Sequence, residues 1–219
     1  NKGNKMKKVL LGIVTFVFIS ANAYAGINVG ISGAFTSLES DGTETTKSSK
    51  QKNKGSRDED VTVPSLFIEI TNDSGVALGI DIVPGEAELG SGTGSNDDNE
   101  STGANKASAE LESHNTIYAL VPVGGSGLYI KGGLAMATVA TTENLKTGTS
   151  YGNEEVDGLM IGLGFQRSTD GGMFFRGEAT YTDYDDVTFN GSLDGDSVRN
   201  VVDADIDATA LRFSLGKSF

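Results

Sequence analysis

The 219-residue sequence contains no cysteine and no tryptophan, only three prolines and a single histidine. The absence of cysteine excludes disulfide bonds and thiolate metal sites. Beyond the first 25 residues, no apolar run approaches the roughly 20 residues that a membrane-spanning helix needs. This absence does not argue for a water-soluble protein, because membrane β-strands are apolar only at alternate positions and hydropathy windows average them away.

Basic residues are scarce, and they are distributed unevenly. Of the 17 basic residues, four lysines precede Gly26, whereas all 30 acidic residues follow it, so positions 26–219 carry a formal charge of −17. Such a chain repels polyanions, and we therefore expect no binding of nucleic acid. A domain without disulfides needs another means of stabilisation, and closure of a β-barrel is one.

The first 25 residues have the features of an export signal. Lys7 and Lys8 precede an apolar run over 9–19, and the small-x-small sequence Ala23-Tyr24-Ala25 follows it. These three features are typical of a cleavable signal peptide, and a run of eleven residues is too short for a membrane anchor. We expect residues 1–25, the signal with a few residues upstream of it, to be separate from a single domain formed by 26–219.

Eight segments alternate apolar residues with small or polar ones, which is the period of a β-strand with two different faces. Most of them approach the length of about nine to eleven residues that a tilted membrane strand needs. In the fourth segment both faces carry apolar residues, so its orientation is ambiguous. The approximate ranges are 27–38, 65–71, 76–83, 115–123, 128–140, 156–166, 173–184 and 207–219.

The connections between these segments alternate between short and long. Short connections rich in Gly, Asn, Asp and Ser, which favour tight turns, lie at 72–75, 124–127 and 168–172. Long polar stretches lie at 39–64, 84–114, 141–155 and 185–206. This alternation is typical of an up-and-down outer-membrane barrel with short periplasmic turns and four long extracellular loops. A Greek-key sandwich would not sort its loops in this way.

One face of the segments is almost entirely aliphatic or aromatic, whereas the other collects small, hydroxyl-bearing and isolated charged residues. A soluble lipocalin-like barrel would turn its apolar face inward, but small residues suit the narrow interior of a membrane barrel. We therefore predict an all-β, eight-stranded antiparallel transmembrane barrel that is apolar outside and polar inside. Its interior charges include both signs, as an ion-pair network requires: Glu69, Asp81, Lys131, Arg176, Glu178 and Arg212.

The last nine residues form an alternating strand that ends on an aromatic residue. Leu211, Phe213, Leu215 and Phe219 share one face, and Arg212 lies on the other. With the signal-like start, the eight strands and the turn pattern, this strand resembles those of the small outer-membrane barrels of the OmpA-like or opacity-type family. In that family the C-terminal strand is a signature that the barrel-assembly machinery reads.

The resemblance implies an integral protein in the outer membrane of a Gram-negative bacterium, without the C-terminal peptidoglycan-binding domain of larger relatives. We expect a structural or surface role with exposed acidic loops, in a monomer. The implied partners are membrane lipid, lipopolysaccharide, and the secretion and barrel-assembly machinery. A narrow porin-like channel and a loop-mediated adhesin remain alternatives, although eight strands leave an interior that side chains can fill.

No cofactor or dedicated metal site is expected, because the acidic stretches 97–100, 183–186 and 194–196 lack the spacing of a calcium loop. Catalysis is not expected either. Some barrels of this size are lipid-modifying enzymes with a histidine and a serine or carboxylate at the outer rim. Here the single histidine, His114, directly follows Ser113, and adjacent strand residues point to opposite faces.

Without tryptophan, other aromatic residues must form the girdles at the two membrane interfaces. We expect Phe35, Tyr181 and Tyr184 near the outer rim. At the inner rim we expect Phe165, Phe175, Phe213 and Phe219.

Overall fold

The computed structural model describes residues 24–46, 50, 52–98, 101–144, 150–191 and 200–219. No helix in this part of the chain has the length and apolar character to cross a bilayer. The regular elements are β1 (Tyr24–Thr46), β2 (Lys52–Asn72), β3 (Ala77–Ile82), β4 (Ala87–Asp98), β5 (Ser101–Pro122), β6 (Leu128–Asn144), β7 (Glu154–Ser168), β8 (Met173–Tyr184), β9 (Val187–Gly191) and β10 (Asn200–Ser218).

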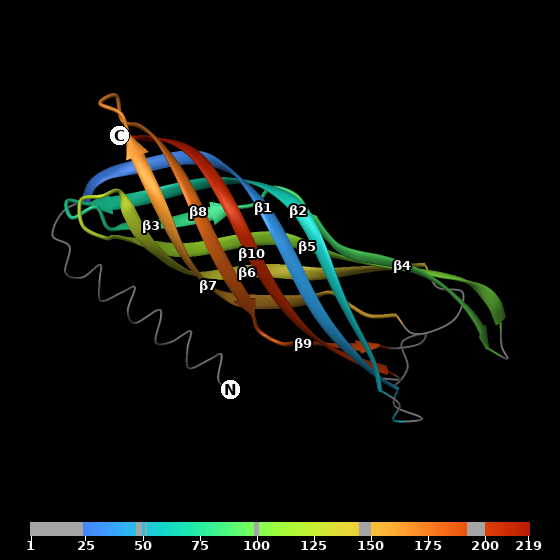
Figure 1. Cartoon of the computed structure of the whole chain (residues 1–219). Coiled ribbons are helices and arrows are strands. Elements are labelled where there is room, and N and C mark those ends of the chain that lie inside the picture. Colours follow the sequence, from blue (N-terminus) through green and yellow to red (C-terminus); the bar gives the residue numbers. More distant parts are fainter. Residues whose placement is uncertain (1–23, 47–49, 51, 99–100, 145–149, 192–199) are drawn as a thin grey trace.

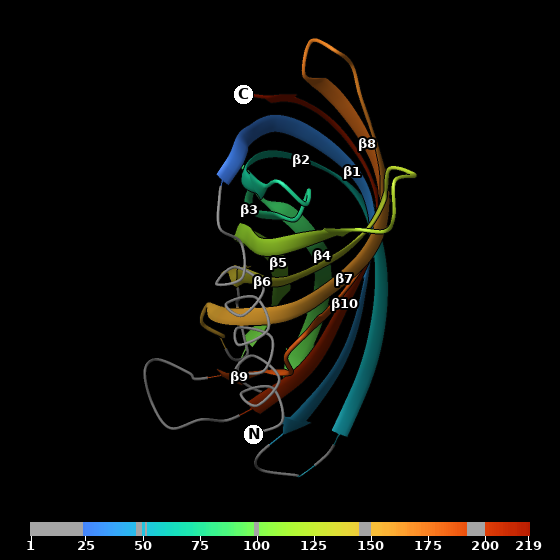
Figure 2. The ribbon, with the colours of Figure 1, turned by 90° about the vertical axis from the view of Figure 1, so that its left-hand side faces the viewer.

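These strands close into a ring of antiparallel neighbours. The order is β1-β2-β3-β5-β6-β7-β8-β10, and β10 pairs back onto β1 with Phe35 opposite Leu211. β4 pairs with β5, as β3 does, and β9 pairs with β10, as β8 does, so two positions of the wall are each built from two consecutive strands. Figures 1 and 2 show the oblique strands and the curved wall that they form. The predicted eight-stranded antiparallel barrel is thus confirmed.

The three short connections form tight turns at one end of the barrel. In the first, the side-chain oxygen of Asn72 accepts hydrogen bonds from the backbone N–H groups of Ser74 and Val76 at 3.0 and 2.9 Å, and Gly75 adopts a φ of +79°. The third turn touches the last strand, because the Ser218 N–H donates to the Gly172 carbonyl at 2.8 Å. This end corresponds to the predicted periplasmic side.

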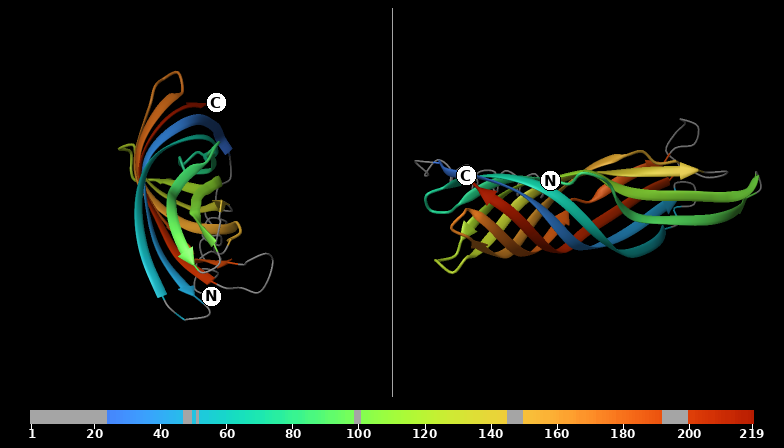
Figure 3. Two further views of the ribbon diagram at one scale, coloured as in Figure 1. Left: turned by 90° about the vertical axis from the view of Figure 1, so that its right-hand side faces the viewer. Right: turned by 90° about the horizontal axis from the view of Figure 1, so that it is seen from above.

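The long polar connections are not irregular over most of their length, because the strands continue through them. β1 and β2 stay paired as far as Thr45 and Lys52, and β4 and β5 as far as Asp98 and Ser101. The β4–β5 hairpin projects beyond the rest of the barrel (Figure 3). Once a hairpin has formed, its backbone hydrogen bonds can continue even where neither face of the strands is apolar. A search for alternating apolar residues therefore misses such strands.

The two faces of the strands exchange character along the barrel, and β10 shows this most clearly. In its inner half Leu211 and Phe213 face outward and are about 60% exposed, while Arg212 is buried inside. In its outer half the outward positions are acidic, and Ile206 and Ala208 are buried inside. The inner half therefore has the surface of a membrane barrel, and the outer half has the core of a soluble one.

Large apolar side chains cover the outside of the inner half. They include Ile31 on β1, Leu163 on β7 and Phe213 on β10, each more than half exposed. Along β1 this belt runs from Ile27 to Phe35, nine residues, which matches the length that a tilted strand needs to cross the hydrocarbon core of about 30 Å. Tyr181 lies outside as expected, but Tyr184 does not belong to the outer girdle, because it is on the inward parity of β8 and only 5% exposed.

A β-bulge lies just before the ambiguous fourth segment. The register of β5 against β6 shifts between Glu112 and Asn115, where Ser113 adopts a φ of +53°. Before the bulge Leu111 points inward, and after it Thr116 and Tyr118 do. The bulge therefore changes which alternate residues of β5 point inward. Within 115–123 the ambiguity arises because Tyr118 and Leu120 are buried inside the barrel while Ile117 and Val121 are exposed outside.

Candidate functional site: a charged layer inside the barrel

The six charged residues of the predicted interior set all lie inside the barrel, and none is more than 8% exposed. They come from five strands, β2, β3, β6, β8 and β10. They form three ion pairs, Arg176–Glu69, Arg212–Asp81 and Lys131–Glu178. We call this set the charged layer.

Arg176 and Glu69 form the most elaborate of these pairs. The guanidinium holds the carboxylate with two parallel hydrogen bonds, of 2.5 Å to Oε1 and 2.7 Å to Oε2. Glu69 also accepts a hydrogen bond of 2.7 Å from the Tyr118 hydroxyl and one of 3.0 Å from the Asn28 amide. The N–H at Nε of Arg176 donates to Gln166 Oε1 at 2.6 Å. Both charges are thus compensated and hydrogen-bonded, which a buried pair requires.

Aromatic rings enclose the Arg176 guanidinium on its remaining sides. Its central carbon lies 4.7 Å from the centroid of the Phe174 ring and 5.3 Å from that of Phe67. The electron-rich face of an aromatic ring attracts a cation, more strongly where water is excluded. The same holds for Lys131, whose ammonium lies 4.1 Å from the Tyr118 ring centroid.

The second and third ion pairs complete the layer. Arg212 donates to Asp81, and its Nη1 also lies 3.3 Å from the hydroxyl of Ser65, which in turn donates to Asp81 at 3.2 Å. Lys131 Nζ lies 3.1 Å from one carboxylate oxygen of Glu178 and 3.4 Å from the other. Each interior charge therefore faces an opposite charge on another strand.

Glycines make room for the large side chains of the interior. Phe67, Tyr118, Tyr129, Phe174 and Tyr184 each pair across the ladder with a glycine on the adjacent strand: Gly30, Gly79, Gly164, Gly216 and Gly158 respectively. A Cβ on Gly79 would lie 2.6 Å from Tyr118, and one on Gly158 would lie 2.8 Å from Tyr184. The rings lie over the glycines, and together with the charged layer they fill the barrel between its two ends.

The charged layer separates two larger spaces. On the side of the tight turns, a space of about 410 Å³ has Arg176 and Gln166 among its lining residues. On the opposite side, beyond the membrane belt, a second space of about 440 Å³ has largely apolar walls. Between them the free volume near Arg212 and His114 is only about 60 Å³. In this geometry the ion pairs occupy the axial path.

The residues of the enzymatic hypothesis do not form a nucleophile–base pair. Ser113 is exposed at the bulge, whereas His114 points inward, where its Nε2 lies 2.9 Å from the Tyr184 hydroxyl. The two side chains thus leave the strand on different sides, as the sequence predicts.

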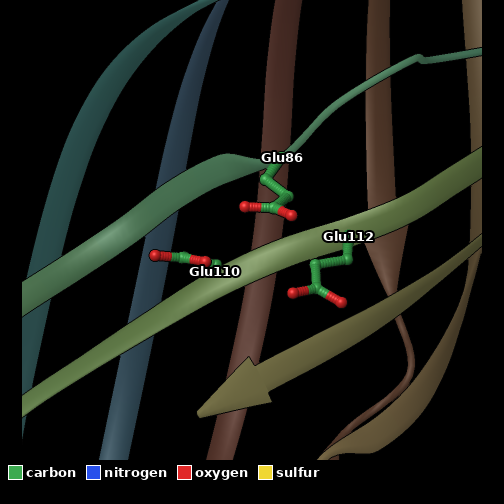
Figure 4. A group of neighbouring side chains, drawn as sticks. All are labelled: Glu86, Glu110 and Glu112. Carbon is green, nitrogen blue, oxygen red and sulfur yellow. The ribbon is translucent and has the colours of Figure 1, made fainter. Parts of the chain in front are cut away.

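Three carboxylates approach one another near the start of β4. The oxygens of Glu86, Glu110 and Glu112 lie within 4.8 Å of each other (Figure 4). Glu86 is exposed and the other two are half-buried, and surface acidic residues often gather in this way without binding a metal. The acidic stretch 194–196 lies outside the described residues.

The fold is shared with solved outer-membrane proteins. The outer membrane protein OprG from Pseudomonas aeruginosa aligns with a TM-score of 0.57 at 17% identity, over 90% of this chain and 97% of that one. The chain has the fold of an outer-membrane β-barrel. The outer membrane protease OmpT from Escherichia coli also aligns with this barrel, with a TM-score of 0.54 at 8% identity, over 91% of this chain and 99% of OmpT. No protein-family model matches the sequence, and no curated protein does.

Sequence reasoning missed the apolar interior of the outer half of this barrel. Its members include Leu89, Leu111, Val187, Phe189 and Ile206, which lie in or beside the stretches predicted as loops. The signal was present in 203–208, where aspartates alternate with Ala204, Ile206 and Ala208. This signal was easy to miss because the apolar residues stand at even-numbered positions in 203–208 and at odd-numbered positions in 211–215.

Proposed function

We propose that the chain is an integral outer-membrane protein of a Gram-negative bacterium, with a structural or surface role and a sealed interior. The observation that carries this proposal is the closed ring with an apolar belt outside and three ion pairs inside. Lipid can solvate the belt, and the closed ladder leaves no unpaired edge within it. The paired charges fill the axis, which disfavours the alternative of a narrow porin.

The finer assignment to OmpA-like or opacity-type barrels belongs to the same proposal. The number of strands and the tight turns at one end support it. We also propose that the predicted signal peptide directs export and that the closing strand, with Leu211, Phe213, Leu215 and Phe219, is read by the barrel-assembly machinery. Residues 1–23 lie outside the described part of the chain, and β1 begins at Tyr24, two residues before the predicted mature start.

Lipopolysaccharide is the proposed outer partner. Just beyond the belt, acidic residues occupy directly opposite positions on neighbouring outward faces: Asp183 with Asp207, Glu39 with Asp207, and Asp41 with Asp205. Like charges in such positions repel each other. Divalent cations shared with lipopolysaccharide phosphates would relieve this repulsion, and we propose such loose contacts for a monomeric barrel.

A loop-mediated adhesin is the second candidate, and the projecting β4–β5 hairpin favours it. A variant that lacks residues 91–107 should still form a barrel and should lose adhesion to a surface that the full chain binds. Equal adhesion by both forms would exclude the hairpin as the adhesive element.

We propose no catalytic function. The separation of Ser113 from His114 supports this proposal, and the shared fold with a protease does not oppose it, because a fold supports many chemistries. Lipid and peptide substrates should remain unmodified in the presence of the refolded protein. Turnover that disappears in a His114→Ala variant would contradict the proposal.

The membrane assignment has a simple test. Unheated protein in sodium dodecyl sulfate should migrate differently from boiled protein, and it should sediment with membranes and require detergent for extraction. Mass spectrometry of the extracted protein should place its first residue at Gly26. A soluble protein whose mobility is unaffected by boiling would contradict the proposal.

A further inference from the structure

The outer half of the barrel contains a cavity of about 440 Å³ that the proposed structural role does not require. Its walls are lined by apolar side chains from five strands, β4, β5, β6, β9 and β10. They include Leu89, Val139, Phe189, Val202, Ala204 and Ile206. A space of this size and character is typical of small-molecule sites, whereas an interior that serves only for packing leaves few voids larger than a water molecule.

Several polar groups around the cavity already have partners within the protein. The Tyr151 N–H donates to Glu143 at 2.9 Å, the Tyr151 hydroxyl donates to Glu44 at 3.3 Å, and Arg57 lies 3.9 Å from Glu59. Some buried side-chain atoms of the described residues lack a hydrogen-bond partner, but they belong to Asp81, Tyr129, Glu178 and Arg212, none of which lines this cavity. The cavity therefore presents no unpaired buried charge that would select a charged ligand.

The charges at the rim bear on the ligand as well. Arg57 and Glu143, which carry opposite charges, both line the cavity, whereas the side chain of Asp41 lies on the outward face of β1. Charges of both signs give the rim no clear preference for an anion or a cation, and the largely apolar walls would strip either ion of its water without replacing it. An uncharged apolar molecule does not incur this cost of desolvation.

One side of the cavity is not closed by a hydrogen-bonded ladder. β2 pairs with β3 only over Leu66–Thr71, and no ladder joins the outer part of β2 to β4 in the described residues. The chain between β3 and β4 contains Pro84, which cannot donate to a ladder, and Gly85, with a φ of +122°. Across this gap, the Cδ of Arg57 lies 2.7 Å from where a Cβ of Gly90 would be. Side chains rather than paired backbone bound the cavity here.

We propose that this cavity is a binding site for a small uncharged apolar molecule, which gains access between β2 and β4. Apolar walls would provide the affinity, and the cost of removing water from a charge would weaken the binding of anions of similar shape. The site lies outside the membrane belt, so the molecule is held in the extracellular half of the barrel, above the charged layer.

The lack of tryptophan allows a direct test in lipid nanodiscs. A Phe189→Trp variant places one tryptophan at the cavity, and a Phe213→Trp variant places one on the lipid face as a control for partition into the membrane. The probe is 1-bromooctane, which quenches tryptophan on contact, and 8-bromooctanoate is its anionic counterpart. Bromooctane should quench the first variant saturably and the second only in proportion to the amount in the lipid. Bromooctanoate should bind the cavity more weakly.

Filling the cavity should remove the saturable quenching. In the Phe189→Trp background, Ala204→Phe adds a ring inside, whereas the matched Thr209→Phe adds one on the outward face of the same strand. The first should raise the half-quenching concentration at least about tenfold, and the second should leave it unchanged. Gly92→Leu, whose Cβ has open space around it, provides a second filling variant if Ala204→Phe fails to fold in the gel-mobility assay. Equal, non-saturable quenching at both reporters, or tighter binding of bromooctanoate, would overturn the proposal.

Discussion

Ile206 and Arg212 point into the same barrel from the same face of β10, six positions apart, yet Ile206 packs in an apolar cluster and Arg212 is ion-paired with Asp81. The outward neighbours change in the opposite sense, from Asp205 and Asp207 to Leu211 and Phe213. This exchange marks where the wall passes from water to lipid. Contact with lipid or with water therefore determines which face of the wall is apolar in each half. The backbone hydrogen bonds between the strands continue through both halves.

Breaking the central ion pair should be more harmful than replacing it. Arg176→Met leaves Glu69 buried without its main counter-charge, and we expect a loss of about 3–5 kcal/mol in the free energy of unfolding. The double variant Arg176→Met/Glu69→Leu removes both charges and should lie closer to wild type than either single variant. Urea unfolding in lipid vesicles measures these differences. Additive losses in the double variant would contradict the account.

The close fit between glycines and rings predicts a position-specific effect on β1. A Cβ on Gly30 would overlap Phe67 and the Leu215 carbonyl, whereas one on Gly33 would meet nothing within 4 Å. Gly30→Ala should therefore lower stability by about 1–3 kcal/mol, and Gly33→Ala should leave it within about 0.5 kcal/mol of wild type. Comparison of the two variants in the same unfolding assay provides the control. Equal effects would show that the interior is not filled as described.

The bulge in β5 predicts that substitutions at Ser113 rank by stability in an order unusual for a β-strand. Its φ of +53° suits glycine or asparagine and strains a β-branched residue. Ser113→Gly should be neutral or slightly stabilising, whereas Ser113→Val should cost about 1–3 kcal/mol. Thermal loss of the compact gel form can rank these variants. If Ser113→Val were the more stable, the bulge would be wrongly placed.

Acidification should stabilise the outer half of the barrel. A hydrogen bond with Asp186, together with partial desolvation and nearby acidic groups, raises the pKa of Asp205 above its ordinary value of 3.8. The native state then holds this proton more tightly than the unfolded state does. The resulting stabilisation is fully present below the ordinary pKa and is lost as pH rises through the raised one.

Stability measured between pH 7 and pH 4 tests this sign. Wild type should gain stability, relative to an Asp205→Asn variant, as the pH falls toward the ordinary aspartate range. Because Asp205 is largely exposed, we expect a small difference that salt reduces. An advantage for wild type that grows with rising pH would contradict the assigned direction.

Much of the membrane half follows from the sequence, because lipid and the narrow interior impose opposite demands on alternate residues. The alternation of apolar and polar residues along β2 and β8 is enough to predict that Arg176 and Glu69 point inward. It does not say that they meet, since they are 107 positions apart and their contact depends on the stagger of strands around the ring. The bulge at Ser113 and the apolar interior near Ile206 escaped for a related reason. At the bulge, the set of alternate residues that points inward changes. Near Ile206, the inward residues stay the same but become apolar. A single alternating pattern along the sequence describes neither change.

The claim that the charged layer seals the barrel is tested most directly by single-channel recording in planar bilayers. Refolded wild-type protein should insert without producing discrete conductance steps, because the three ion pairs and the rings over the glycines occupy the axis. A porin recorded in the same bilayers provides the positive control for detection. Reproducible conductance steps from the folded wild-type barrel would contradict the sealed interior.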